Sequence, residues 1–278
     1  MEYQGDNVKL DLLELAHKDH ALISVIGGLE FGKCAEIVES QPVTFMTPES
    51  FIALPKWDVK NRNGTISFQF RTTEPNGLLM YNSAKYGSSN LDFFGMEIID
   101  GYFYLIIALG TGATKQKVSR NRVDDGVLHL VHLLYVGKTG RIQIDSHDQD
   151  YLSPGMGMQL DLEDMLFVGG LDFERYNAYR LPKELWSGIL KQGYVGCLQD
   201  LKINDEKIDL MTVARKQQQR DVRNECRKVE AQCSSQQCMH KGTCHEGWNR
   251  YVCDCRNTSY RGKNCEHGKF DINLYCLI

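Results

Sequence analysis

Hydrophobic and polar positions alternate along much of the chain between residues 35 and 226, with the two-residue period of β-strands. Apolar Ile66, Phe68 and Phe70, for example, alternate with polar neighbours. Asn76-Gly77 and Asp100-Gly101 mark tight turns between apolar segments. Strands are predicted over 66–71, 78–81, 94–99, 102–107, 130–135, 141–145, 165–168 and 195–203, and one or two helical turns within 210–219. We therefore expect an all-β fold, a sandwich of two antiparallel sheets.

Six of the ten cysteines lie in a C-terminal segment of about 35 residues, which is below the roughly 40 at which a chain closes a core unaided. They are Cys233, Cys238, Cys244, Cys253, Cys255 and Cys265. Disulfides are therefore expected to stabilise this segment, and disulfides persist in oxidising compartments. Spacing alone leaves fifteen pairings open. A zinc site that uses Cys253, Cys255 and the nearby His240 and His245 is disfavoured, because paired zinc ligands are usually separated by two or more residues.

Composition narrows the class of protein. The 278 residues carry a net charge of −4, which argues against nucleic-acid binding, and 42% are hydrophobic, as in globular chains. We find no run of the 18 to 20 apolar residues that a membrane span needs; the apolar stretch 21–31 is too short. The acidic start Met1-Glu2-Tyr3 is unlike a signal peptide. We expect the chain to be a piece of a longer secreted or membrane-anchored protein.

The chain contains an internal repeat. Residues 203–210 and residues 3–10 both show a strand, a polar turn and a strand, and each copy is followed by a lone cysteine, Cys226 or Cys34. Cys197 lies just upstream of the complete copy. This arrangement predicts a Cys197–Cys226 disulfide. Cys34 is left without a mate, because the equivalent cysteine would precede the first residue.

Three stretches resemble the laminin G-like, or LNS, family. Residues 66–79 resemble the strand-turn-strand hallmark of that family; their sequence is Ile-Ser-Phe-Gln-Phe-Arg-Thr-Thr-Glu-Pro-Asn-Gly-Leu-Leu. Residues 167–170 and 193–198 resemble its closing strands. The chain departs from the family at Leu128, where Trp is usual, and at Tyr135, where Arg is frequent. The resemblance implies an LNS sandwich, and the departures, with the unmatched final 13 residues, suggest either a divergent member or a transcript that ends abnormally.

The cysteine-rich segment resembles an EGF-like module, which places an aromatic and a turn glycine between its last two cysteines, here Tyr260 and Gly262. This resemblance implies the pairs Cys233–Cys244, Cys238–Cys253 and Cys255–Cys265. The order of modules, with residues 247–255 inside the EGF, is similar to the third LNS domain and second EGF module of α-neurexins.

These patterns divide the chain into four parts. We expect a remnant of a preceding LNS domain over 1–34, an LNS domain over 35–228, an EGF-like module over 229–266 and an unmatched tail over 267–278. The tail contains Cys276, and a Cys34–Cys276 bridge is an open alternative to two free thiols.

LNS sandwiches commonly carry Ca²⁺ at one rim, held by two acidic side chains and backbone carbonyls. The matching positions are Asp92, the carbonyl of Leu109, the carbonyl of Gln159, and Asp161. Oxygen ligands of this kind suit a hard cation. The alternative is that both aspartates are ordinary solvated loop acids, and Glu163 and Asp164 allow more than one alignment.

Two kinds of carbohydrate site are candidates. Asn63-Gly64-Thr65 and Asn257-Thr258-Ser259 are N-glycosylation sequons, so Asn63 and Asn257 are predicted acceptors. A basic run that includes Arg215, Lys216 and Arg220 suggests heparan-sulfate binding, although such residues at a helix end are often only solvated.

Enzyme signatures are weak. His129 and His132 flank a predicted strand without an evident nucleophile, and Gly110-Thr111-Gly112 lacks the third glycine of a dinucleotide loop. We expect a non-enzymatic adhesion fragment of a cell-surface protein. The resemblance implies neuroligin-type or dystroglycan-type partners. The alternative is a lectin-like module of a matrix protein that binds sulfated glycans.

Overall fold

The computed structural model describes residues 2–5, 8–11, 41–59, 62–84, 92–110, 112–154, 157–176, 181–226, 231–233, 237–248 and 250–268. Two compact units are present, residues 1–39 and residues 40–278. In the first unit, β1 (Glu2–Gly5) and β2 (Val8–Asp11) pair as an antiparallel hairpin. The rest of the expected LNS remnant, with Cys34, lies outside the described residues, as do Cys276 and the tail from residue 269.

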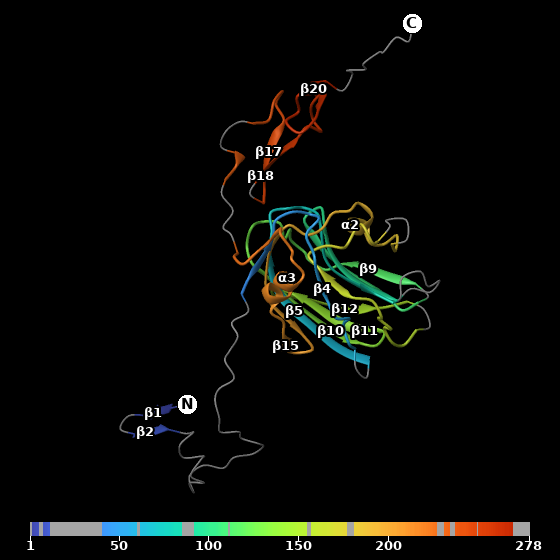
Figure 1. Ribbon diagram of the computed structural model, residues 1–278, viewed down its shortest axis with the longest axis vertical. Coiled ribbons are helices and arrows are strands. Elements are labelled where there is room, and N and C mark those ends of the chain that lie inside the picture. Colours follow the sequence, from blue (N-terminus) through green and yellow to red (C-terminus); the bar gives the residue numbers. More distant parts are fainter. Residues whose placement is uncertain are drawn as a thin grey trace. The chain divides into compact units, whose positions relative to one another are not determined.

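Two antiparallel sheets form the sandwich of the second unit (Figure 1). Among the described residues, the larger sheet has the order β12 (His147–Leu152), β11 (Thr139–Ile144), β10 (His129–Val136), β5 (Asn63–Arg71), β14 (Gly196–Ile203), β3 (Val43–Phe45) and β16 (Val222–Arg223), with β15 (Glu206–Lys207) paired to β14. The smaller sheet has the order β4 (Ile52–Leu54), β13 (Leu166–Val168), β6 (Gly77–Ser83), β7 (Phe93–Ile99), β8 (Tyr102–Ala108) and β9 (Ala113–Lys117). The expected all-β sandwich is thereby confirmed.

Aromatic side chains from both sheets fill the core. Ile66, Phe68 and Phe70, the apolar positions of the alternating segment, are all 0% exposed. The ring of Phe70 in β5 lies 5.8 Å from that of Phe103 in β8 and joins the two sheets. The period-two pattern therefore identified the inward face of the central strand correctly.

The short and polar strands were not predicted. β3 and β4 are three residues each, too short to show a period, and the edge strands β9 and β12 carry mostly polar side chains. Among the described residues, the helices are α2 (Trp186–Ile189) and α3 (Leu210–Lys216), both short. The predicted helical turns correspond to α3, which begins after Asp209, whose carboxylate accepts from the Thr212 N–H at 3.0 Å.

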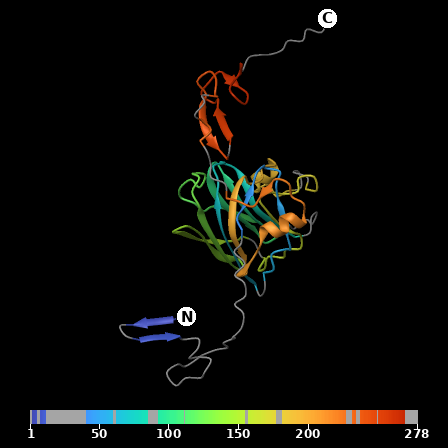
Figure 2. The same ribbon diagram turned by 60° about the vertical axis from the view of Figure 1, so that its left-hand side comes forward.

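The C-terminal module consists of short hairpins. β17 (Thr243–Gly247) pairs with β18 (Arg250–Asp254), and β19 (Tyr260–Arg261) pairs with β20 (His267–Gly268) (Figure 2). Disulfides join Cys233 to Cys244, Cys238 to Cys253, and Cys255 to Cys265, the pairs that an EGF-like module implies, and a fourth joins Cys197 to Cys226. Within the described residues, no helix is long and apolar enough to cross a membrane.

Candidate functional site

Asp92 and Asp161 meet at one rim of the sandwich. Phe93 pairs with Ala108 in the β7–β8 ladder, so Asp92 and Leu109 follow at the same end of these two strands. The N–H of Asp161 donates to Asp92 Oδ2 at 2.8 Å. Two aspartates that are 69 positions apart in sequence are therefore neighbours in space.

Contacts with Tyr135 and with the Leu109 carbonyl hold the loop that carries Asp161 in place. The Leu160 N–H donates to the Tyr135 hydroxyl at 2.8 Å, and the Tyr135 ring packs against Trp57 at 5.8 Å. Gly157 approaches the Leu109 carbonyl so closely that a Cβ would collide with it. Tyr135 was noted in the sequence only as a departure from the family pattern; its role as an anchor of the rim loop had no separate signal.

Gln159 completes the group of expected ligands. It is exposed on the same loop, and its side-chain Nε2 donates to Asp161 Oδ1 at 3.2 Å. The structure therefore brings Asp92, Leu109, Gln159 and Asp161 to one rim, beside a polar pocket of about 250 Å³ that Asp161 and Gln159 help to line.

The alternative alignment at Asp164 is less suitable. Asp164 is engaged elsewhere, because its carboxylate accepts a hydrogen bond from the Tyr176 hydroxyl and pairs with Arg175 at 3.5 Å. The Glu163 backbone N–H donates to the Ser83 carbonyl at 3.1 Å. Of the acids in this loop, Asp161 is the one whose backbone contacts Asp92.

The electrostatics of the rim favour a cation. Partial burial raises the pKa of Asp92; the hydrogen bond from Asp161 opposes this rise, and the negative charge of Asp161 adds to it. Both carboxylates also contribute to the raised pKa of Tyr135, whose first cause is burial. Within the described part of the chain, no lysine, arginine or histidine pairs with Asp92 or Asp161 within 4.0 Å. Two adjacent carboxylates with a backbone carbonyl nearby fit a hard divalent cation.

A second set of contacts joins the sandwich to the EGF-like module. Glu74, in the loop after β5, is 5% exposed, and its carboxylate accepts from the Trp248 N–H at 2.9 Å. Arg250 binds the same carboxylate with two nitrogens, Nε at 2.8 Å and Nη2 at 2.5 Å. This bidentate pairing also raises the pKa of Arg250.

Trp248 is the apolar part of this junction. Its side chain is 3% exposed and packs with Val195 and the Cys197–Cys226 disulfide of the sandwich. The guanidinium of Arg71 lies 5.6 Å from the centre of the Trp248 ring. Two stretches that the sequence singled out only as family hallmarks, 66–79 and 247–255, thus contact each other.

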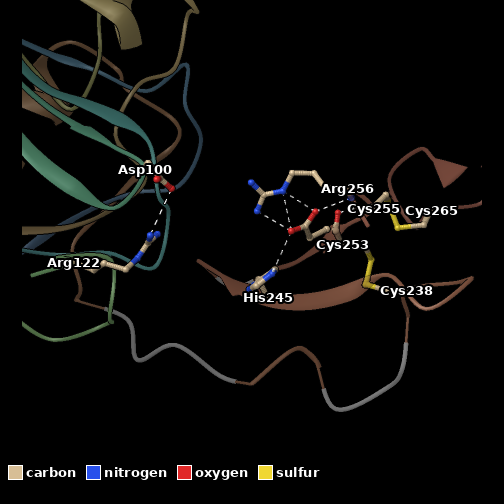
Figure 3. Close-up of polar contacts among 9 residues, drawn as sticks. Asp100, Arg122, Cys238, His245, Cys253, Cys255, Arg256 and Cys265 are labelled. Carbon is tan, nitrogen blue, oxygen red and sulfur yellow. Dashed lines mark hydrogen bonds and ion pairs between the residues drawn. A yellow bond between two sulfur atoms is a disulfide. The ribbon is translucent and has the colours of Figure 1, made fainter. Parts of the chain in front are cut away.

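A cleft of about 970 Å³ lies beside this junction and is lined by residues of both modules. On the sandwich side, Arg122 pairs with Asp124 at 2.6 Å and with Asp100 at 3.5 Å. On the EGF side, Arg256 pairs with Asp254 at 2.8 Å and holds the pKa of that carboxyl at about 2 (Figure 3). The charges that line the cleft are thus largely neutralised within their own modules.

The remaining candidates do not form a reactive centre. His129 and His132 project to opposite faces of β10, and the ring of His129 lies between Asp125 at 3.1 Å and Asp145 at 2.8 Å. No group of three metal-binding side chains occurs among the residues that the structure describes. The carbohydrate candidates are all on the surface, since the following residues are exposed: Arg215, Lys216, Arg220, Asn63 and Asn257.

Comparisons with known proteins agree with this architecture. Residues 70–206 match the laminin G domain family and residues 233–264 match the EGF-like domain family. Neurexin-3a of Danio rerio is 38% identical over an alignment of 290 residues that includes 99% of this chain, and Neurexin-2 of Rattus norvegicus is 39% identical over the same length. The chain spans 17% of the length of each of these relatives.

Two solved structures share the sandwich fold. The LG1-3 region of the laminin alpha2 chain superposes with a TM-score of 0.58 at 24% identity, and covers 69% of this chain and 36% of its own length. Domains LG4-5 of the mouse laminin alpha1 chain superpose with a TM-score of 0.53 at 20% identity, with 67% of this chain and 48% of that chain covered.

Proposed function

Because the chain is neurexin-like and non-enzymatic, with a laminin G domain followed by an EGF-like domain, we propose that it is an extracellular interaction unit of a cell-surface protein. The rim at Asp92 and Asp161 presents the binding surface, and the EGF-like module sets the distance to whatever module follows. The contact between Asp92 and Asp161 is the observation that carries this proposal.

Calcium is the ion that this rim suits best. Asp92 and Asp161 would supply charge, and the carbonyls of Leu109 and Gln159 would complete the protein ligands. So few protein ligands correspond to the weaker class of extracellular calcium modules, with dissociation constants of about 10⁻⁴ to 10⁻³ M. A bound ion would neutralise the two carboxylates and fix the loop around Leu160.

The EGF-like module acts as a spacer of fixed orientation. Support comes from Glu74, which lies in the sandwich and binds both Trp248 and Arg250 of the module. A buried carboxylate with three donors restricts rotation more than a surface ion pair would, because breaking these bonds leaves a charge without partners in a site of low dielectric constant.

Family resemblance suggests neuroligin-type or dystroglycan-type cell-surface proteins as partners. The test is capture of membrane proteins from neuronal cells on the immobilised secreted protein, in calcium and in chelator. We expect discrete cell-surface proteins to be retained in calcium and lost in chelator.

Variants at the rim make this test specific. Asp92→Asn and Asp161→Asn should abolish calcium-dependent capture, whereas Glu163→Gln, which removes one charge from the same loop, should retain it. Equal capture by all three variants would show that the partner surface lies elsewhere on the protein.

Sulfated-glycan binding is a second candidate function. Arg215 and Lys216 are the exposed basic residues of the last turn of α3, and Arg220 is exposed four positions beyond that turn. If this surface binds heparan sulfate, Arg215→Ala with Lys216→Ala should reduce retention on heparin, and Lys183→Ala, at a residue whose side chain is 92% exposed, should not. Equal retention of both variants would exclude this surface.

A further inference from the structure

The outer face of the larger sheet carries exposed apolar side chains. Along β10, buried residues alternate with exposed ones, and the exposed positions include Leu134 at 40% and Val136 at 44%. Leu152, on the edge strand β12, is 65% exposed. We call Leu134, Val136 and Leu152 the outer stripe. The solvated face of an antiparallel sheet is usually polar, so a row of exposed apolar side chains on that face marks a surface that another group could cover.

The strand register places a sequon in line with this stripe. Leu152 pairs with Thr139, Thr139 with Val136, and Val136 with Asn63, so these four residues form one row across four strands. Adjacent strands are about 4.8 Å apart, so Asn63 adjoins Val136 and lies about 15 Å from Leu152. In the next row on the same face, Leu134 pairs with Thr65, the third residue of the sequon.

Side-chain direction in β5 agrees with the register. Gly64 is buried, and a Cβ at this position would lie 2.8 Å from the Trp57 ring, so position 64 faces the core. Asn63 on one side of it is exposed, and Thr65 on the other is half-buried, so both face outward. The amide of Asn63 is therefore on the same face as the outer stripe.

We propose that Asn63 carries an N-linked glycan and that this glycan covers the outer stripe. In the reaction, Asn63 Nδ2 attacks the anomeric carbon of an oligosaccharide carried on a lipid diphosphate. The new bond joins Nδ2 to that carbon, the bond from the carbon to the diphosphate oxygen breaks, the lipid diphosphate leaves, and Nδ2 loses one proton. The four disulfides of the described residues indicate passage through the oxidising compartment where this donor acts.

A glycan is the occupant that the geometry favours. Its attachment point is in the same row as Val136 and Leu152, so the sugar is tethered beside the stripe at all times, whereas a second copy or a partner would bind only at sufficient concentration. A hydrated oligosaccharide also keeps the face soluble. The role of this glycan is to prevent self-association through the larger sheet.

The test begins with the secreted, folded protein. Glycopeptide mass spectrometry should find Asn63 occupied, and enzymatic removal of the glycan from the folded protein should increase both dye binding to exposed apolar surface and self-association in sedimentation velocity. Each apolar side chain buried between two copies corresponds to about a tenfold rise in the association constant. An unoccupied Asn63, or a deglycosylated protein that remains monomeric with unchanged dye binding, would overturn the proposal.

Variants separate the glycan from the sequence change. Thr65→Ala, which abolishes the sequon but keeps Asn63, should self-associate like the deglycosylated protein, and Thr65→Ser, which preserves the sequon, should remain monomeric. Combining Thr65→Ala with Leu134→Gln and Val136→Thr should restore the monomer. Asn257→Gln removes the sequon of the EGF-like module and should leave self-association unchanged. Self-association that persists in the triple variant would also contradict the proposal.

Discussion

The laminin G sandwich and the EGF-like module reach stability by different routes. In the described part of the sandwich, a continuous core of buried residues joins the two sheets, and one disulfide crosslinks Cys197 to Cys226. In the described part of the EGF-like module, three disulfides replace such a core, and the two buried hydrophobic side chains are Trp248 and Cys265. A chain of that size cannot bury enough apolar surface to fold unaided.

Trp248 shows how the two modules depend on each other. It belongs to the EGF-like module, but the residues that bury it, Val195 and Cys197, belong to the sandwich. The small module therefore buries its tryptophan against its neighbour. Covalent crosslinks thus define the fold of the EGF-like module, whereas its orientation depends on a shared interface.

The largest expected effect comes from the crosslinks of the EGF-like module. Replacing Cys238 and Cys253 by Ala should unfold this module, because loss of a native disulfide from a small secreted domain costs about 2–5 kcal/mol and often prevents folding. The sandwich should remain folded. Hydrogen exchange that rises in 243–268 but not in β5 would match this expectation; a protected EGF-like module in the variant would contradict it.

Truncation of a core side chain should destabilise the sandwich and leave the EGF-like module folded. Phe70→Ala removes a fully buried ring that contacts Phe103 in the opposite sheet and should lower the free energy of unfolding of the sandwich by about 3–5 kcal/mol. Chemical denaturation followed by the total tryptophan fluorescence, to which the buried Trp57 of the core contributes, measures this loss. The three EGF disulfides should form normally in this variant, and failure to form them would show that the module cannot fold independently.

An intermediate effect is expected at the junction. Arg250→Ala leaves the carboxylate of Glu74, whose side chain is 6% exposed, with the Trp248 N–H as its remaining partner from the module. The cost is about 1–3 kcal/mol of docking free energy, toward the lower end because the Arg250 side chain is 62% exposed. Faster hydrogen exchange of the Trp248 N–H measures it. Arg256→Ala, a change of the same kind at an ion pair within the module, should leave this exchange rate unchanged.

The smallest effect is a pH dependence at the rim. Burial and the charge of Asp161 raise the pKa of Asp92 in the folded protein. Between the unfolded and the folded pKa of Asp92, the folded protein therefore binds a proton more readily than the unfolded chain does. Without calcium, the contribution of Asp92 to stability should therefore fall as pH rises through this window. Asp92→Asn should remove this trend and stabilise the calcium-free protein near neutral pH, by less than about 1 kcal/mol.

Thermal unfolding in chelator between pH 4 and pH 7 tests the sign of this pH dependence. Glu163→Gln is the matched control, and it should keep the trend of the wild-type protein. If the stability of the wild-type protein rose with pH relative to that of Asp92→Asn, the raised pKa of Asp92 would be contradicted.

Much of the fold was predictable because the central strands are long and alternate regularly. β5, β7, β8, β10 and β14 were all found from their periods and from turns such as Asp100-Gly101. β3, β4, β9 and β12 were missed, because three-residue strands show no period and polar edge strands lack an apolar face. The pairing of β3 with β14, far apart in sequence, is set by tertiary packing alone.

The rim was predictable in part. Residue types and family resemblance suggested Asp92 and Asp161, but only the structure shows that the Asp161 N–H contacts Asp92, whereas Tyr176 and Arg175 engage Asp164. The junction was not predicted. A Glu in one module and a Trp more than 170 positions later have no local pattern that connects them.

Calcium titration calorimetry of the secreted protein shows whether the rim at Asp92 and Asp161 binds the ion. We expect a binding heat with a dissociation constant of about 10⁻⁴ to 10⁻³ M, lost in Asp92→Asn and in Asp161→Asn and retained in Glu163→Gln. The absence of any calcium heat at millimolar concentrations in the folded wild-type protein would contradict it.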